Sequence, residues 1–135
     1  KRKQRAEFFV IDEVKATGAT VLAIAPESWE KLAVTTEKGK VDGIDPGYIL
    51  LSDASQEASG QFNLTFELDE ATQTKYEGYG IDLASWNANS EWTLPVPGVF
   101  VIDQESVIRF AHVDEDYRKR IDVDTLLSEI RKVSR

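Results

Sequence analysis

An apolar pattern between residues 99 and 113 predicts a β-hairpin. Residues 99–102 form a continuous apolar run that is rich in β-branched side chains. Such a run is too short for a helix and is typical of a strand covered on both faces, in the middle of a sheet. A polar turn over residues 103–106 follows, and residues 107–113 resume as an apolar strand interrupted by polar residues. We therefore expect antiparallel pairing, with the second strand at an edge.

Two prolines immediately precede this hairpin. Pro95 and Pro97 have no backbone N–H to donate to a ladder, so we expect both to lie just before the strand. The bond between Val96 and Pro97 is one at which a cis peptide is tolerated.

Strand and helix patterns alternate in the first half of the chain. Residues 6–16 have helical spacing, with Gly18 as a C-terminal cap, and residues 20–25 form an apolar run typical of a parallel strand. A second helix begins after Ser28, and residues 48–51 form the next strand. This order implies parallel strands joined by right-handed crossovers.

For two helices of this half, the sequence also predicts the cap or the residues that face inward. The short helix that runs to about Gln61 is expected to be capped by Ser52 or Asp53, with Ala58 and Phe62 turned inward. In the helix that follows Ser28, the side chains expected to face inward are Trp29, Leu32, Ala33 and Thr36, which lie at positions i, i+3, i+4 and i+7.

Residues 63–93 form the least regular part of the pattern, and we interpret them as an irregular insertion or lid. A polar helix is expected over residues 69–79, and a long loop that contains Trp86 and Trp92 follows it. Two interpretations of the tryptophans stay open, because they could cover the open end of the sheet or contact a substrate.

A terminal helix is expected to begin at Asp122 or Asp124, either of which is a good N-terminal cap. Its apolar face, which we expect to cover the hairpin, comprises Leu126, Leu127, Ile130 and Val133.

Composition favours one soluble domain. The chain has 135 residues, of which 41% are hydrophobic, and its 24 acidic and 16 basic residues give a net charge of −8. This length supports a single domain over residues 1–135, and the negative charge disfavours nucleic acid and anionic lipid as partners. We find neither an apolar run of about 20 residues nor a secretory leader, so we expect a cytoplasmic protein with no membrane partner.

The chain contains no cysteine and no methionine. At average usage about two cysteines and about three methionines are expected in a chain of this length, so we interpret it as a processed, excised or incompletely represented product. These residues therefore hold no disulfide framework, no thiolate nucleophile and no cysteine-based metal site. We expect no catalytic residue, metal site or cofactor within the chain as written.

Four segments carry a resemblance to a known family. They are GATVLAIAPES (residues 18–28), YILLSD (residues 48–53), LPVPGVFVID (residues 94–103) and VIRFAHVDEDYRKR (residues 107–120). Their order and spacing, over nearly the whole chain, resemble the bacterial peroxiredoxin-like proteins of the alkyl hydroperoxide reductase/thiol-specific antioxidant family.

The resemblance implies a thioredoxin-like α/β fold, in which helices flank a mixed sheet. The family's peroxidatic cysteine lies at the N-terminus of the first helix, where the helix dipole and nearby cations stabilise the thiolate. The matching segment would directly precede Lys1, so the basic residues 1–5 would lie beside that thiolate. The strand leading to the cysteine would lie between the strands at residues 20–25 and 99–102. Its absence is expected to leave two half-sheets with unpaired edges.

Pro97 departs from the family pattern. Typical peroxiredoxins have an arginine at this position, whereas thioredoxins have a cis-proline that faces the active-site thiol. The resemblance implies that Trp92, Val96 and Pro97 face the active site, with the backbone of Val96 presented to an extended disulfide substrate. The alternative is that Pro97 only keeps a backbone donor out of the start of the strand.

Other chemistries are less well supported. His112 is the only histidine, and we expect it to be a partly buried or edge-strand residue. Asp114, Glu115 and Asp116 lack the glycine and the ligand spacing of an EF-hand. We expect them to form a solvated acidic turn that the basic residues 118–120 neutralise. The glycines match no phosphate-binding G-x-x-x-x-G-K-[ST] motif.

We expect the complete protein to reduce peroxides or disulfides through a thiol. Its partners would be the peroxide or disulfide substrate and an external thiol reductant, and the chain as written would be inactive. The alternative is a redox-silent module that binds a partner through residues 86–97 or forms a homodimer through its edge strand. A cysteine ahead of Lys1 in the encoding gene would discriminate between the two.

Overall fold

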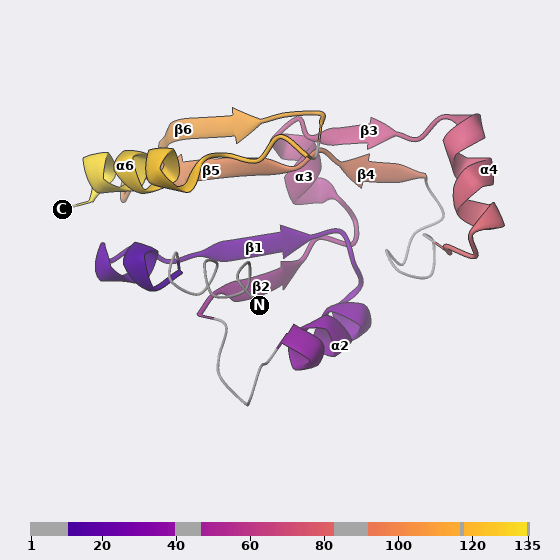
Figure 1. Ribbon diagram of the computed structural model, residues 1–135, viewed down its shortest axis with the longest axis horizontal. Coiled ribbons are helices and arrows are strands. Elements are labelled where there is room, and N and C mark those ends of the chain that lie inside the picture. The colour runs from indigo at the N-terminus through magenta and orange to yellow at the C-terminus, as the bar shows by residue number, and fades with distance from the viewer. Residues whose placement is uncertain (1–10, 40–46, 83–91, 117, 135) are drawn as a thin grey trace. The chain divides into compact units, whose positions relative to one another are not determined.

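The described part of the chain is of the α/β class. The computed structural model describes residues 11–39, 47–82, 92–116 and 118–134 (Figure 1). A helical segment over residues 11–16 comes first, and the strands of the described residues form three two-stranded sheets. In chain order the other elements are β1 (Leu22–Ala25), α2 (Trp29–Gly39), β2 (Ile49–Ser52), α3 (Glu57–Gln61), β3 (Thr65–Glu67), α4 (Glu70–Gly78), β4 (Thr93–Pro95), β5 (Gly98–Ile102), β6 (Ile108–Val113) and α6 (Val123–Val133).

β1 and β2 form a parallel pair, as the alternation of strand and helix predicted. The N–H of Ile49 donates to the carbonyl of Val21 at 3.0 Å, and the N–H of Asp53 donates to the carbonyl of Ala25 at 2.8 Å. Donor and acceptor advance together along the chain, so the strands run in the same direction. α2 lies between them in the sequence and forms the predicted crossover.

One face of this pair carries exposed apolar side chains. In a parallel ladder, the residue that donates to the carbonyl of residue i lies beside residue i+1, and alternate residues share a face. Ile49 therefore lies beside Leu22, and Leu51 lies beside Ile24. Between 39% and 55% of the surface of each of these four residues is exposed.

The contacts divide the chain into two compact units. Unit 1 comprises residues 1–22, 45–49 and 97–135, and unit 2 comprises residues 23–44 and 50–96. β1 and β2 contribute residues to both units. The single domain expected from the sequence stays a prediction.

The predicted hairpin is present in unit 1. β5 and β6 pair antiparallel, starting with Gly98 opposite Val113. The expectation that the first strand is covered on both faces was wrong, because burial in β5 is confined to Val101 and Ile102 is 49% exposed. β5 has one neighbouring strand in its sheet, so fewer side chains cover its two faces than would cover a strand in the middle of a larger sheet.

A β-bulge decides which side chains of the hairpin face inward. Val101 pairs with Phe110, whereas Ile102 pairs with Ile108, so Arg109 is an extra residue in β6. Val101 and Phe110 belong to the core of the unit, whereas the pair on the other side of the bulge is about half exposed. The bulge therefore places Ile108 outside, although its spacing from Phe110 would otherwise put both on one face.

α6 covers this hairpin, as its apolar stripe predicted. Asp122 is the N-cap, and its carboxylate accepts a hydrogen bond from the N–H of Thr125 at 3.0 Å. The helical segment of residues 11–16 ends as expected at Gly18, which has a φ of +86° and donates to the carbonyl of Lys15 at 2.9 Å. The core comprises Val14, Val101, Leu127 and Ile130, with Ala19, Val21, Phe110, Leu126 and Val133 packed against it.

Unit 2 contains an antiparallel strand pair that the sequence pattern did not predict. β3 lies within residues 63–93, the region expected to be an irregular insertion, and its partner β4 begins at the end of that region. Pro95 lies in β4 and pairs with Thr65, so it is not merely a residue ahead of the next strand. α4 lies between the two strands in sequence and matches the predicted polar helix, with the Asp69 carboxylate accepting from the N–H of Thr72 at 2.7 Å.

The inward face expected for α2 was partly wrong. Leu32 is 1% exposed, as predicted, but Trp29 is 65% exposed and Ala33 is also exposed. The side chain of Thr36 lies outside the described part of the structure. A two-stranded sheet offers a helix less surface than a full sheet does, so in the part of α2 whose side chains are described fewer residues are buried than the spacing suggests.

β1 and β5 lie in different sheets. Within the described ranges, β1 has β2 as its single partner and β5 has β6. The described strands form three two-stranded sheets rather than the two half-sheets expected, and the missing central strand that the resemblance implies stays a prediction.

Candidate functional site

The segment of residues 92–96 contains two of the three predicted site residues and is anchored at both ends. The N–H of Leu68 donates to the carbonyl of Trp92 at 2.8 Å, and the N–H of Val96 donates to the carbonyl of Leu64 at 2.7 Å. These bonds extend the β3–β4 ladder by one residue on each side. The ladder therefore fixes the course of the backbone through the whole segment.

The predicted site residues differ in exposure and in backbone state. Trp92 and Val96 are half-buried at the two ends of this segment, and Pro97 is exposed at the start of the chain that leads into β5. The peptide bond before Pro97 is trans, as are the others among the described residues. The cis-proline implied by the resemblance is thus absent, and the N–H of Val96 is already taken by Leu64.

Gln56 is the buried polar residue that holds this segment from the other side. It is 6% exposed, and its Nε2 donates to the carbonyl of Thr93 at 2.8 Å. Its backbone is left-handed, with a φ of 55°, a conformation that costs a residue other than glycine about 1 kcal/mol or more. Its Oε1 is buried and has no hydrogen-bond partner among the described residues, a state that costs about 1–3 kcal/mol. Sequence reasoning missed Gln56, because a glutamine in a polar stretch gives no signal of burial.

Asp53 secures the backbone next to Gln56. Its carboxylate accepts from the N–H of Ala58 at 3.1 Å, from the N–H of Ser59 at 2.8 Å and from the hydroxyl of Ser59 at 2.7 Å. Burial alone would raise the pKa of Asp53, but the hydroxyl of Ser59 and the neighbouring backbone amides together lower it. The carboxylate therefore stays ionised at neutral pH and accepts from the first turn of α3. The helix begins later than expected, because its N-cap is Gln56. Of the two caps predicted, Asp53 still binds amides of the first turn, whereas the Ser52 hydroxyl donates to the carbonyl of Glu27 at 2.7 Å.

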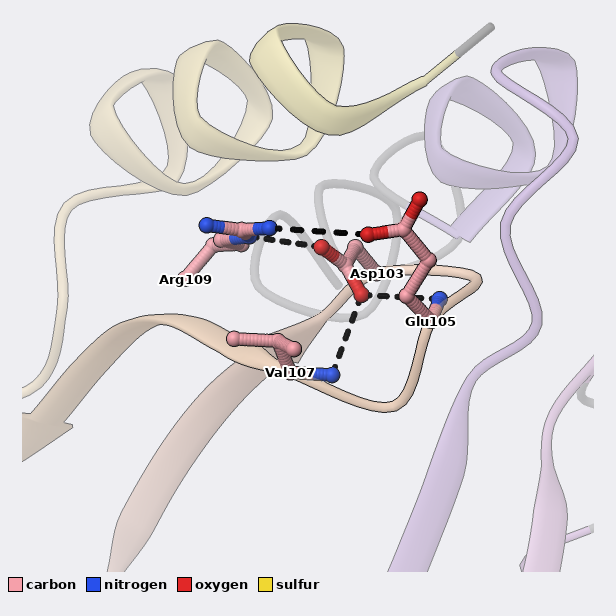
Figure 2. A network of polar contacts seen from close by, with 4 residues as sticks. All are labelled: Asp103, Glu105, Val107 and Arg109. Carbon is pink, nitrogen blue, oxygen red and sulfur yellow. Dashed lines mark hydrogen bonds and ion pairs between the residues drawn. The ribbon is translucent and has the colours of Figure 1, made fainter.

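Figure 2 shows a second carboxylate with several partners, Asp103 in the turn between β5 and β6. Its Oδ1 accepts from the amides of Glu105 at 2.9 Å and Val107 at 3.0 Å, and its Oδ2 accepts from Nε of Arg109 at 2.6 Å. The amide of Val107, and then the guanidinium of Arg109, lower the pKa of Asp103. Both oxygens serve the turn, so we interpret this network as structural.

Two further candidates from the sequence, His112 and the acidic residues 114–116, lie on β6 and directly after it. His112 is half-buried on β6, with Nε2 3.4 Å from the carbonyl of Lys119. Asp116 lies 2.9 Å from Nε of Arg118, whose hydrogen bonds lower the pKa of that carboxyl, so one of the three acidic residues is paired with one of the basic residues expected to neutralise them. In the part of the chain that the structure describes, no three His, Cys, Asp or Glu side chains are placed to hold a metal ion.

Some predicted features lie outside the described residues, namely the basic cluster at residues 1–5, Trp86 and most of its loop. Among the helices that the structure does describe, none is long and apolar enough to cross a bilayer. In comparisons with known proteins, no family model matches the chain, and no curated protein matches it.

Proposed function

We propose that this chain is the thioredoxin-like part of a thiol-dependent peroxidase of the alkyl hydroperoxide reductase/thiol-specific antioxidant family. The observation that carries the proposal is the pairing of the strands. In the described residues β1 and β5 each have one partner, and these are the two strands between which the family's fold has a further, cysteine-leading strand. The order of β1, α2 and β2, followed later by β5, β6 and α6, agrees with the same fold.

The reaction needs a cysteine that these 135 residues do not contain. We place it on the segment that would supply the further strand. Its thiolate attacks one oxygen of the peroxide, the O–O bond breaks, and the leaving oxygen takes a proton to become an alcohol or water. The sulfur is oxidised to a sulfenic acid. An external thiol condenses with it, releasing water, and a second thiol then reduces the mixed disulfide. The cytoplasm keeps such reductants reduced, so we place the protein there.

The hydrogen bonding of Val96 favours a peroxide over a protein disulfide as the substrate. An extended disulfide substrate would pair with the backbone of Val96, but its N–H already donates to Leu64. A small peroxide needs no strand-like pairing. In this proposal Trp92, Val96 and Pro97 form one wall beside the thiol and limit the access of water to it.

The proposal is tested with the full-length gene product and the 135-residue chain, side by side. We expect the full-length protein to carry a cysteine ahead of Lys1 and to consume hydrogen peroxide or an alkyl hydroperoxide in an assay coupled to thioredoxin, thioredoxin reductase and NADPH. The 135-residue chain should equal the blank, as should full-length protein with that cysteine replaced by serine. A gene without such a cysteine, or a full-length protein as inactive as the serine variant, would contradict the proposal.

A redox-silent binding module is the second candidate. Two observations favour it, namely the lack of cysteine in the chain and the exposed apolar face formed by Leu22, Ile24, Ile49 and Leu51. A homodimer is the simplest form of this function. Two measurements on the full-length protein distinguish the candidates, namely sedimentation velocity over a hundredfold range of concentration and the coupled peroxidase assay. The binding module requires a complex in the first and no peroxide turnover in the second.

A further inference from the structure

We infer that Gln56 is a positioning residue, which holds the β4 backbone at Thr93 and thereby sets the place of Trp92 and Val96. Its hydrogen bond to Thr93 joins residues far apart in the sequence, from the start of α3 to the middle of the candidate site. The ladder to β3 holds one edge of this segment, and Gln56 holds it from a second direction. The N–H of Leu64 donates to the carbonyl of Ser59 at 2.9 Å and ties the start of β3 to α3, whereas the Gln56 bond ties β4 to the same helix.

The chemistry of the contact fixes the orientation of the amide. The carbonyl of Thr93 can only accept a hydrogen bond, so the NH₂ group of Gln56 must face it and the oxygen must face away. That leaves Oε1 buried without a partner. The side chain therefore makes one long-range bond in a setting that is otherwise unfavourable, with a left-handed backbone and an unsatisfied oxygen. We take this combination to indicate a role in placing Thr93 rather than a role in stability.

A second glutamine of the same unit provides a matched control. The Nε2 of Gln73 donates to the carbonyl of Leu68 at 2.7 Å, so it too binds the backbone of this hairpin through its amide. The two differ in reach, because Gln73 is five residues from its acceptor and Gln56 is 37 residues from its own. Loss of the Gln73 bond should loosen only the start of α4.

The first experiment measures amide hydrogen exchange by NMR in the full chain, for wild type, Gln56→Met and Gln73→Met. Methionine matches the length of glutamine and removes the donor and the unpartnered oxygen together. For Gln56→Met we expect exchange at the amides of Leu68 and Val96 to rise about fivefold, while the midpoint of denaturant unfolding stays the same or rises. For Gln73→Met we expect both amides to exchange as in wild type.

The second variant uses pH to switch the contact. Gln56→Glu has almost the same shape, but its carboxylate repels the carbonyl of Thr93, whereas its protonated form can donate to it. Protection of Leu68 and Val96 should therefore be lost at neutral pH and regained as the introduced carboxyl is protonated. Asp53 and Glu57 are the ionisable neighbours in sequence, and wild type measured over the same pH range accounts for their titration. Equal exchange in wild type and both Gln56 variants, or a loss of global stability without a local rise in exchange, would overturn the inference.

A kinetic measurement extends the inference to the site and rests on the proposed function. In the full-length protein, Gln56→Met should raise KM for the peroxide several-fold with a smaller change in kcat, because Gln56 contacts none of the reacting atoms. Gln73→Met should leave both unchanged. An inactive wild-type protein would refute the proposed function and leave the exchange result standing. Normal kinetics in Gln56→Met, with raised exchange, would refute the link between Gln56 and the site.

Discussion

The described residues contain two antiparallel strand pairs, the β5–β6 hairpin and the β3–β4 pair, which are held in different ways. β5 and β6 are joined by a short turn, organised by Asp103, and their inner face packs under Leu127 and Ile130 of α6. β3 and β4 are joined through α4 and a long connection, and Leu68 is the buried apolar residue beside them. The first hairpin is held by local turn chemistry and a hydrophobic core, whereas the second is held by backbone bonds and one buried amide. The comparison shows that a strand pair held by local contacts can be predicted from the sequence, whereas one held by distant contacts cannot.

The largest expected effect comes from a substitution in the hydrophobic core that holds the β5–β6 hairpin. Leu127→Ala removes a side chain that is 3% exposed in the core of unit 1, so the free energy of unfolding should fall by about 2–5 kcal/mol. Denaturant unfolding measures the loss, and hydrogen exchange in β5 and β6 locates it. Val123→Ala is the control, because Val123 lies in the same helix but is 41% exposed, and its effect should be within about 0.5 kcal/mol. Equal effects of the two substitutions would show that α6 does not cover the hairpin.

A smaller effect is expected from the N-cap of α6, the helix that packs on the β5–β6 hairpin. Asp122→Ala removes the acceptor for the N–H of Thr125 and should lower the free energy of unfolding by about 1 kcal/mol. Asp124 is the second residue of α6 and stabilises it only through the helix dipole, so Asp124→Ala should lower the free energy of unfolding by about 0.3 kcal/mol. Asp69→Ala removes the corresponding cap of α4, a helix with no buried residue in the structure. Its effect should stay within α4 and leave hydrogen exchange in β5 and β6 unchanged.

The smallest effect is the pH dependence of the turn between β5 and β6. The pKa of Asp103 is lowered in the folded state, so its contribution to stability is complete above the unfolded value of about 3.9. That contribution is lost as the pH falls below this value and through the lower folded pKa. The amide shift of Val107, followed by NMR during acid titration, should report the loss. In Asp103→Asn the shift should no longer follow this titration, and an unchanged titration would show that another carboxyl is responsible.

The sequence predicts the elements whose signals are local. The apolar run of β5, the turn at Asp103, the cap at Asp122 and the stripe of α6 are each encoded within a few neighbouring residues, and the structure confirms them. Residues 93–95 and 65–67 carry no comparable signal, because their pairing depends on a partner far away in the sequence.

The same distinction applies to the candidate site. Its residues Trp92, Val96 and Pro97 could be named from a resemblance, but the bond from Val96 to Leu64 and the trans peptide before Pro97 could not. The bond from Val96 depends on the unforeseen pairing of β3 with β4. The burial of Gln56 had no signal either, since composition assigns glutamine to the surface.

The bulge at Arg109 marks a place in β6 where the chain can lose a residue without a change of register. Removing Arg109 would leave Val101 opposite Phe110 and Ile102 opposite Ile108, now in a regular ladder. Adding or removing a residue between Phe110 and Val113 would instead exchange the two sides of the segment that follows, because side chains alternate along a strand. Relatives of this protein should therefore vary in length at Arg109 more readily than elsewhere in β6.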